Sequence, residues 1–297
     1  MSVFSAFYYP DNEISGIKMS ATGFFKITRP ANAVVSGITA IIAYLIATGT
    51  VIPSTILLLV TVTLITAAGN VINDYFDANI DRINRPERPI PSGSVSPKAA
   101  RGFAVTLFLS GILVAIFTPS LCLFIAIINT LILVLYAVKL KSMPVVGNAT
   151  VAYLTASIFL FGGAFAGGDA LVLMLPLAAI TFLATMAREI LKDAEDVEGD
   201  AAGDAYTLPI CTGIQSTSRI ALGFALAAGV ASVIPYLRWG SWYLVGIFIV
   251  DIIIIVAAIR TLPCQTPACV KATQSTTLIK MGMFAALVVF SLSAVCL

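Results

Sequence analysis

The sequence predicts an all-α integral membrane protein with nine transmembrane helices. Three observations lead to this prediction. The composition is 59% hydrophobic and only 11% charged, whereas soluble domains carry about 25% charged residues. Long apolar segments recur along the chain, each close to the roughly 20 residues that span a bilayer. Finally, positive residues gather on the connections that would lie at one membrane face.

The nine apolar segments are best explained as helices. None has the strict alternation of a membrane strand, and a helix satisfies its own backbone hydrogen bonds in lipid. In chain order, we predict helices over residues 24–47, 54–77, 98–118, 120–138, 146–167, 170–192, 217–236, 240–261 and 276–296.

The connections between these helices alternate in length and charge. Short, nearly uncharged connections alternate with longer ones that carry lysine and arginine. Of the 17 positive residues, only Arg238 lies on the side of the short connections. The positive-inside rule then predicts a multi-pass protein of the cell membrane, with the N-terminus and long loops cytoplasmic and the C-terminus outside. The net charge of +2 gives no sign of nucleic-acid binding.

The chain reads as one membrane-embedded domain over residues 1–297, with a short polar segment at 1–20. A weak internal repeat is visible, because acidic clusters end both the second and the sixth predicted helix. Two four-helix halves in the same orientation would bring both clusters to one membrane face.

The residue types available restrict the chemistry. The chain has no histidine and five cysteines, so the usual neutral-pH base and transition-metal ligand are missing. Cys264 and Cys269 lie close in sequence, but a zinc site needs more ligands than one such pair. We therefore expect neither a metal nor a disulfide there. Chemistry must rely on carboxylates, lysine, arginine, tyrosine and a hard cation.

Two acidic rows carry the functional prediction. Asn73, Asp77 and Asp81 recur every four residues along one side of a predicted helix, and Asp193, Asp196 and Asp200 form a second row. A single row at a helix end is usually solvated interface charge. Two rows of oxygen ligands without histidine or cysteine indicate Mg²⁺, Ca²⁺ or Mn²⁺. Mg²⁺ held by both rows with a diphosphate between them fits this pattern.

Cations accompany the acids at the same predicted membrane face. The loop at 82–93 holds Arg82, Arg85 and Arg88 among prolines, and guanidinium groups grip phosphate oxygens in pairs. For Arg82 and Arg88, phosphate binding and contact with lipid headgroups are equally plausible, whereas Arg85 fits headgroups better. The same face also carries Lys26, Arg29, Lys139, Lys141 and Lys192.

Two features inside the predicted spans favour structural roles. Asp251 lies away from the acidic rows, so a hydrogen bond to a neighbouring helix is the favoured interpretation over a functional site. The glycine-rich segment 161–168 indicates close helix packing.

The motifs resemble the UbiA superfamily of intramembrane prenyltransferases over nearly the whole chain. The first signature matches residues 73–93, the second matches 192–200, and Tyr136 with Lys141 is similar to a Tyr/Lys element after the fourth helix. Arg29-Pro30 with Asn32 looks like the entry to the first helix. The sequence departs from the pattern at Leu140, where many relatives have a basic residue.

The resemblance implies a helical bundle of this type around a central cavity and Mg²⁺-dependent transfer of an isoprenyl chain to a lipophilic acceptor. By position, it implies that Asp77, Asp81, Asp196 and Asp200 are catalytic. Mg²⁺ would be held by Asn73, Asp77, Asp81, Asp196 and Asp200, with Asp193 in support. The implied substrate-binding residues are Arg29, Asn32, Arg82, Arg88, Tyr136, Lys141 and Lys192.

The second motif most resembles archaeal enzymes that form the second ether bond of membrane lipids. That resemblance implies geranylgeranyl diphosphate as donor and geranylgeranylglyceryl phosphate as acceptor. Two alternatives stay open. One is a prenyltransferase of the same superfamily with an aromatic or chlorin acceptor, and the other is a secondary transporter or channel, whose intramembrane acids would mark an ion path.

Overall fold

A computed structural model describes residues 19–202 and 205–296, so the predicted polar segment at 1–20 lies almost entirely outside the described residues. Helices and turns account for the regular structure of that part of the chain. Its nine helices of 18 residues or more are α2 (Pro30–Thr48), α3 (Ile56–Phe76), α5 (Pro97–Ala115), α6 (Ser120–Val138), α7 (Val146–Ala166), α8 (Gly168–Glu195), α11 (Ile214–Ala231), α12 (Tyr236–Ile259) and α14 (Ser275–Cys296).

The all-α membrane prediction is confirmed. Eight of these helices are long and apolar enough to cross a bilayer. The ninth, α11, is 18 residues long, and its N-terminal part is polar from Gln215 to Arg219. Residues 232–235 form a turn instead of continuing the helix predicted over 217–236.

The first predicted helix, at 24–47, is divided in the structure. A short helix α1 (Ala21–Ile27) precedes α2, which begins at Pro30. Ser20 caps α1 by accepting a hydrogen bond from the amide of Gly23 at 3.0 Å. Proline cannot continue the hydrogen bonding of a preceding helix but is well suited to start a new one, so the two helices separate at this point.

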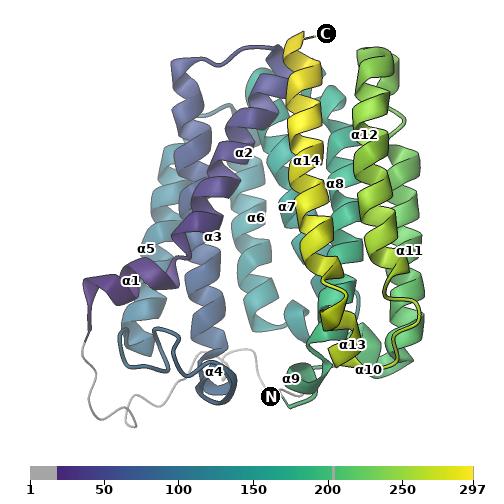
Figure 1. Ribbon diagram of the computed structural model, residues 1–297. Coiled ribbons are helices and arrows are strands. Elements are labelled where there is room, and N and C mark those ends of the chain that lie inside the picture. The colour runs from purple at the N-terminus through teal and green to yellow at the C-terminus, as the bar shows by residue number, and fades with distance from the viewer. Residues whose placement is uncertain (1–18, 203–204, 297) are drawn as a thin grey trace. The chain divides into compact units, whose positions relative to one another are not determined.

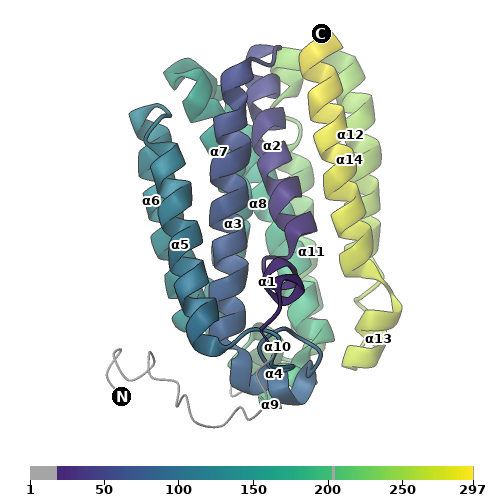
Figure 2. The same cartoon turned by 90° about the vertical axis from the view of Figure 1, so that its left-hand side faces the viewer.

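The chain divides into two compact units. The first unit comprises the residues up to Thr39 and Ile56–Lys139. In it, α3 packs against both α5 and α6, as Figure 2 shows, and the short helix α4 (Ala78–Asn84) follows α3 directly. Ser96 caps α5 by accepting from the amide of Ala99 at 3.2 Å, which fixes where the chain enters the membrane span.

The second unit comprises Ala40–Thr55 and Leu140–Leu297. Its central helix is α8, which packs against α7, α11 and α14 (Figure 1). Near the start of α12, Trp239, Tyr243 and Phe290 form an aromatic cluster, with the Tyr243 and Phe290 rings stacked at 6.2 Å. The remaining short elements of this unit are η2 (Pro53–Thr55), η3 (Leu140–Ser142), α9 (Val197–Ala202), α10 (Leu208–Thr212) and α13 (Pro267–Ala272).

A glycine of the 161–168 segment permits the close packing predicted there. A Cβ atom on Gly162 would lie 2.6 Å from the Cβ of Ala43 and 2.9 Å from the backbone nitrogen of Tyr44. Only glycine allows α7 to approach the second half of α2 so closely.

Candidate active site

The first acidic row lies where α3 ends. The helix stops at Phe76, and α4 starts at Ala78 after the single residue Asp77, so the row is not on one continuous helix as its spacing predicted. The backbone hydrogen bonds across this break nevertheless join residues four apart, as in an α-helix. The amide of Asp77 donates to the carbonyl of Asn73 at 2.9 Å, and that of Asp81 to the carbonyl of Asp77 at 2.8 Å. The three predicted ligands therefore remain one helical turn apart.

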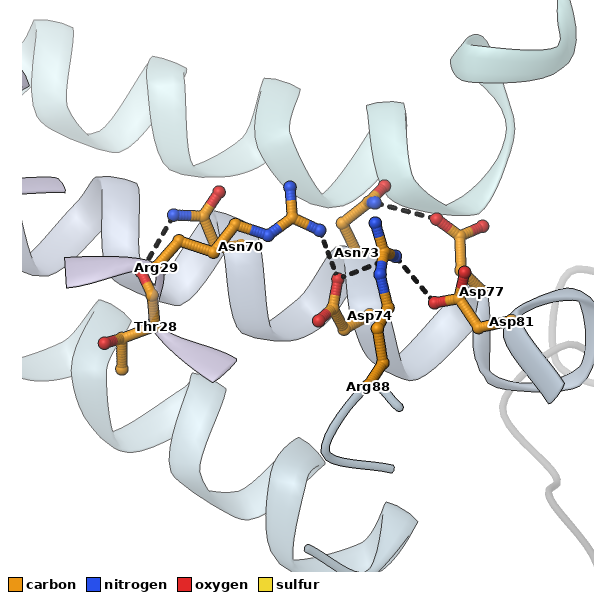
Figure 3. Close-up of polar contacts among 8 residues, drawn as sticks. All are labelled: Thr28, Arg29, Asn70, Asn73, Asp74, Asp77, Asp81 and Arg88. Carbon is orange, nitrogen blue, oxygen red and sulfur yellow. Dashed lines mark hydrogen bonds and ion pairs between the residues drawn. The ribbon is translucent and has the colours of Figure 1, made fainter. Parts of the chain in front are cut away.

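Two arginines converge on the acids of this region, as Figure 3 shows. Arg29 lies 2.6 Å from Oδ1 of Asp74, and Nη1 of Arg88 lies 3.3 Å from the same atom. Nη1 of Arg88 also lies 2.6 Å from Oδ2 of Asp81. Asp74 and Asp81 are buried, at 3% and 5% exposure, and buried carboxylates need partners of this kind. The predicted phosphate ligands and a predicted metal ligand thus share one network.

Sequence reasoning missed Asp74 as a functional residue. It is the acid that holds Arg29 and Arg88 together, although its position between Asn73 and Asp77 points it to another side of the helix. A signal was available, because an acid within a membrane span almost always has a partner. Two candidate partners, Arg29 and Arg88, were already among the predicted residues.

Arg29 owes its position to the break between α1 and α2. Its φ is +49°, a conformation that costs a non-glycine residue free energy, and it directly precedes Pro30, which disfavours the right-handed helical alternative. The adjacent Thr28 carbonyl accepts a hydrogen bond from Nδ2 of Asn70 at 2.9 Å. The strained residue is therefore fixed by α3 on both sides, through Asn70 and through Asp74. Strain of this kind tends to occur at functional sites.

Asn73 has an oxygen suited to a cation. Its Nδ2 donates to Oδ2 of Asp77 at 2.8 Å (Figure 3). Its Oδ1 is buried and has no hydrogen-bond partner in the described part of the chain. A buried acceptor without a partner calls for an explanation. A hard cation, which coordinates amide and carboxylate oxygens, supplies one.

The second acidic row repeats the arrangement of the first. α8 ends at Glu195, Asp196 separates the two helices, and α9 begins at Val197. The amide of Asp196 donates to the carbonyl of Asp193 at 3.2 Å, and the amide of Asp200 donates to that of Asp196 at 3.0 Å. Here too, a long span is followed by one connecting acid and a short helix. Asp196 is exposed, whereas Asp193 and Asp200 are partly buried.

Neighbouring helices of the second unit hold this end of α8 in place. Nδ2 of Asn148, in α7, donates to Oδ2 of Asp193 at 2.8 Å. Oγ1 of Thr276, in α14, donates to Oε1 of Glu195 at 2.9 Å. Sequence reasoning named neither donor, because each lies far from its acceptor along the chain.

One turn earlier on α8, a buried glutamate is paired with two cations. Glu189 is 7% exposed and forms an ion pair with Arg188, while Nζ of Lys192 lies 3.6 Å from its Oε2. Lys192 itself is exposed. Its ammonium group therefore lies close to the second row and within reach of solvent.

Asp200 lies in the short helix α9, outside the membrane spans. Burial raises the pKa of its carboxyl above the ordinary value of 3.8, and the nearby carboxylate of Asp196 raises it further. Both effects come from disfavouring negative charge. A bound divalent cation would act in the opposite direction, because it favours the ionised carboxylate.

The loop that carries Lys141 is shaped by its backbone. A Cβ atom on Gly147 would lie 3.2 Å from the Cα of Lys141, so glycine lets the loop fold against the start of α7. Val145 has a φ of +65°, a strained conformation for a β-branched residue. The amide of Tyr206 donates to the carbonyl of Ser142 at 3.1 Å, which ties the loop to the segment after the second row.

The remaining predicted residues are more peripheral. Asn32 is exposed in the first turn of α2, Arg82 is exposed in α4, and Tyr136 is partly buried near the end of α6. The first unit thus gathers Arg29, Asn73, Asp74, Asp77, Asp81 and Arg88, and the second unit gathers Lys141, Lys192, Asp193, Asp196 and Asp200. Within the described residues, no three acidic or cysteine side chains form a ready-made metal cluster.

Asp251 forms the interhelical hydrogen bond that we favoured for it. Oγ of Ser232, at the end of α11, donates to Oδ2 of Asp251 in α12 at 2.6 Å. The hydroxyl of Tyr243 donates to the carbonyl of Ser232 at 2.7 Å. This small polar cluster satisfies buried groups inside the helix bundle.

The interpretation of the cysteine pair was wrong. Cys264 and Cys269 form a disulfide that closes the turn between α12 and α13. Cys264 is buried and packs with Val270 against Ala194 of the second row's helix. A single cysteine pair falls short of a zinc site, but the turn between the two residues brings their Cα atoms to 5.4 Å, within reach of a disulfide.

The fold and the paired acidic rows are those of an intramembrane prenyltransferase, and the chain belongs to the UbiA prenyltransferase family, whose model matches residues 36–292. It is 62% identical over 277 residues to digeranylgeranylglyceryl phosphate synthase of Methanoregula boonei, covering 93% of this chain and 99% of that one. It is 58% identical to the synthase of Methanoculleus marisnigri, covering 93% and 100%. The chain is therefore a prenyltransferase similar to these synthases, which decides against the transporter or channel alternative.

Solved structures agree with this classification. A structure of digeranylgeranylglyceryl phosphate synthase is similar with a TM-score of 0.81 at 35% identity, covering 93% of this chain and 99% of that one. A UbiA homolog from Archaeoglobus fulgidus bound to DMAPP and Mg²⁺ gives a TM-score of 0.67 at 14% identity, covering 91% and 99%. The second likeness bears on the fold alone.

Proposed function

We propose that this prenyltransferase transfers a geranylgeranyl group from geranylgeranyl diphosphate to the free hydroxyl of geranylgeranylglyceryl phosphate, with Mg²⁺ as cofactor. The product carries the second ether bond of archaeal membrane lipids. The observation that carries this proposal is the 62% identity, over 93% of the chain, to a digeranylgeranylglyceryl phosphate synthase. Identity of that extent supports a shared donor and acceptor as well as a shared fold.

The donor set of both rows fits Mg²⁺. This ion prefers oxygen ligands and is usually bound by one or two carboxylates together with substrate phosphate oxygens. The partnerless Oδ1 of Asn73 supports its role as a ligand. In this proposal, one ion is held by Asn73, Asp77 and Asp81, and the other by Asp196 and Asp200 with Asp193 in support. Bound there, the metal supplies positive charge for the diphosphate leaving group.

The cations of the site serve to bind the diphosphate. Asp74 holds Arg29 and Arg88 close to the first row, and each guanidinium has five N–H donors, more than its ion pairs use. The remaining donors are suited to phosphate oxygens. Arg82, Lys141 and Lys192 add charge at the rim, and Asn32 and Tyr136 complete the predicted set of substrate-binding residues.

The reaction breaks the bond between the allylic carbon and the diphosphate oxygen. Negative charge then grows on the leaving group, where the guanidinium and ammonium groups stabilise it. The allylic carbon becomes a carbocation, and the apolar side chains of the membrane-spanning helices keep water away from it. The acceptor hydroxyl forms the new ether bond, and its proton passes to a carboxylate of the site or to the departing diphosphate.

We further infer that the protein lies in the cell membrane with its N-terminus and the loops that follow the acidic rows on the cytoplasmic side, and its C-terminus outside. The charge asymmetry supports this orientation, since Arg238 is the only one of the 17 positive residues on the opposite side. The shared arrangement of the rows, a long span followed by one acid and a short helix, supports two related four-helix halves.

A product assay tests the proposed function. The purified protein would be incubated with geranylgeranyl diphosphate, Mg²⁺ and, in separate reactions, geranylgeranylglyceryl phosphate, an aromatic acid or a chlorin acceptor. We expect mass spectrometry to detect digeranylgeranylglyceryl phosphate, together with pyrophosphate release that requires both metal and acceptor. Prenylation of an aromatic or chlorin acceptor, with none of the glycerol phosphate lipid, would overturn the proposal.

A further inference from the structure

Asn148 is a buried polar residue in the first turn of α7. It is 6% exposed and belongs to a helix long and apolar enough to span the membrane. A buried amide in such a helix is costly unless it is hydrogen-bonded. Its Nδ2 donates to Oδ2 of Asp193, 45 residues away on α8, at 2.8 Å. This bond satisfies the amide and joins α7 to the second acidic row.

The bond constrains one of the two oxygens of the Asp193 carboxylate. Oδ2 accepts from Asn148, whereas Oδ1 accepts no hydrogen bond within the described part of the chain. Rotation of the carboxylate about its terminal bond would break the contact. The hydrogen bond therefore fixes the direction in which Oδ1 points.

The donor at this position is neutral, as is the Asn73 amide that donates to Asp77 in the first row. Asp74 and Asp81, in contrast, are neutralised by arginines. An amide favours the ionised carboxylate through hydrogen bonding but leaves its negative charge in place for another partner. Hydrogen-bond partners of this kind orient metal-binding carboxylates, and their loss typically costs 10- to 100-fold in metal affinity or activity.

We propose that Asn148 is a positioning residue that orients the Asp193 carboxylate toward a divalent cation in the second row. The inference rests on the proposed function, because it takes the second row to bind metal. It adds a residue that neither acidic motif contains. The adjacent Gly147 accommodates the backbone of Lys141, so the first turn of α7 positions a cation and a carboxylate of the same unit.

Direct metal binding provides the test. Mn²⁺ would be titrated into detergent-purified protein in the presence of inorganic pyrophosphate, and the free ion measured by electron paramagnetic resonance. Asn148→Leu keeps the size of the side chain but removes the donor, and we expect it to weaken Mn²⁺ binding about tenfold. The Mg²⁺ concentration for half-maximal turnover should rise by a similar factor, while kcat at saturating Mg²⁺ should change less than about threefold.

A matched control and a double mutant separate positioning from packing. Thr150→Val removes a buried hydroxyl of α7 that bonds within its own helix, and it should leave Mn²⁺ affinity unchanged. In an Asp193→Asn background, Asn148→Leu should have almost no further effect, because the oriented group is gone. Asn148→Ser provides a smaller substitution should the leucine variant fail to fold, and it should also weaken binding.

Unchanged Mn²⁺ affinity in the folded Asn148 variants would overturn the proposal. So would an undiminished loss of Mn²⁺ affinity when Asn148→Leu is made in the Asp193→Asn background. These outcomes are independent of the acceptor. If the product assay fails while Asn148→Leu still weakens Mn²⁺ binding, the proposed reaction is wrong and the positioning role stands. If the lipid product forms but metal affinity is unaffected, the positioning role alone is wrong.

Discussion

The guanidinium of Arg29 donates to Oδ1 of Asp74 across 2.6 Å, joining the junction of α1 and α2 to the end of α3. The same oxygen also lies 3.3 Å from Arg88. One carboxylate, 3% exposed, therefore sets the position of two cations that we assign to the diphosphate. Removing it would leave Arg29 without its ion pair and Arg88 with Asp81 as its remaining partner.

Asp74→Asn should therefore impair binding of the prenyl diphosphate. The amide keeps the shape of the side chain but cannot balance two positive charges. We expect the KM for geranylgeranyl diphosphate to rise at least about tenfold. The value of kcat/KM should fall as well, because Arg29 and Arg88 would no longer be held in position for the diphosphate. Steady-state kinetics in detergent at saturating Mg²⁺ would measure both.

Asn79→Ala is the matched control, because Asn79 is exposed on α4, next to the first row. It should leave KM close to that of the unaltered enzyme. A normal KM in a folded Asp74→Asn variant would show that Asp74 does not position the phosphate-binding cations.

The proposed metal roles predict severe losses at single aspartates. Asp77→Ala and Asp200→Ala each remove one carboxylate from a different row, so each should abolish turnover while the protein remains folded. Circular dichroism and size-exclusion chromatography would check folding, and pyrophosphate release would measure turnover. Activity above about a tenth of the normal rate in either variant would argue against the metal role of that residue.

Much of the fold could be predicted because hydrophobic length is a local property. The apolar run predicted over 120–138 is α6 to the residue, and the predicted one-turn spacing of Asn73, Asp77 and Asp81 is kept by their backbone hydrogen bonds. The breaks were harder to predict. An acidic residue such as Asp77 or Asp196 can continue a helix or separate two, and only the packing around it decides between these outcomes.

The missed residues share a physical reason. Arg29 and Asp74 are 45 residues apart, as are Asn148 and Asp193. Neither partner has a periodic or motif signal that points to the other, because the pairing depends on which helices pack together. Asn148 in particular is one polar residue in an apolar span, and sequence offers several possible partners for it.

Removal of divalent ions should inactivate the enzyme reversibly. The acidic rows contain only oxygen ligands, and Mg²⁺ bound by few protein ligands exchanges with a chelator. We expect EDTA to stop pyrophosphate release and added Mg²⁺ to restore it, with Mn²⁺ as a second ion that suits oxygen donors. Turnover that survives exhaustive chelation would exclude the magnesium mechanism.

The raised pKa of Asp200 predicts how metal-free protein responds to pH. A carboxyl with a higher pKa in the folded state than in the unfolded state stabilises the fold below its ordinary pKa of 3.8. That contribution is lost as the pH rises through the folded value. Asp200→Asn should therefore raise the Tm of metal-free protein near neutral pH, and the gain should shrink toward pH 4.

Magnesium supplies the control for that experiment. Saturating Mg²⁺ with pyrophosphate should stabilise the unaltered protein more than Asp200→Asn, because the cation favours only the ionised carboxylate. A lower Tm for the metal-free variant at neutral pH would contradict the assigned effect of burial.

The disulfide between Cys264 and Cys269 should contribute to stability more than to chemistry. It closes a short turn, and the entropy of so small a loop corresponds to about 2 kcal/mol. Because the buried Cys264 packs with Val270 against Ala194, replacing both cysteines by serine should lower the Tm measurably, and a reductant should lower the Tm of the unaltered protein in the same way. Cys211→Ser replaces an exposed free cysteine. It should change neither the Tm nor the effect of the reductant on the Tm. A double variant with an unchanged Tm would mean that the crosslink does not stabilise this turn.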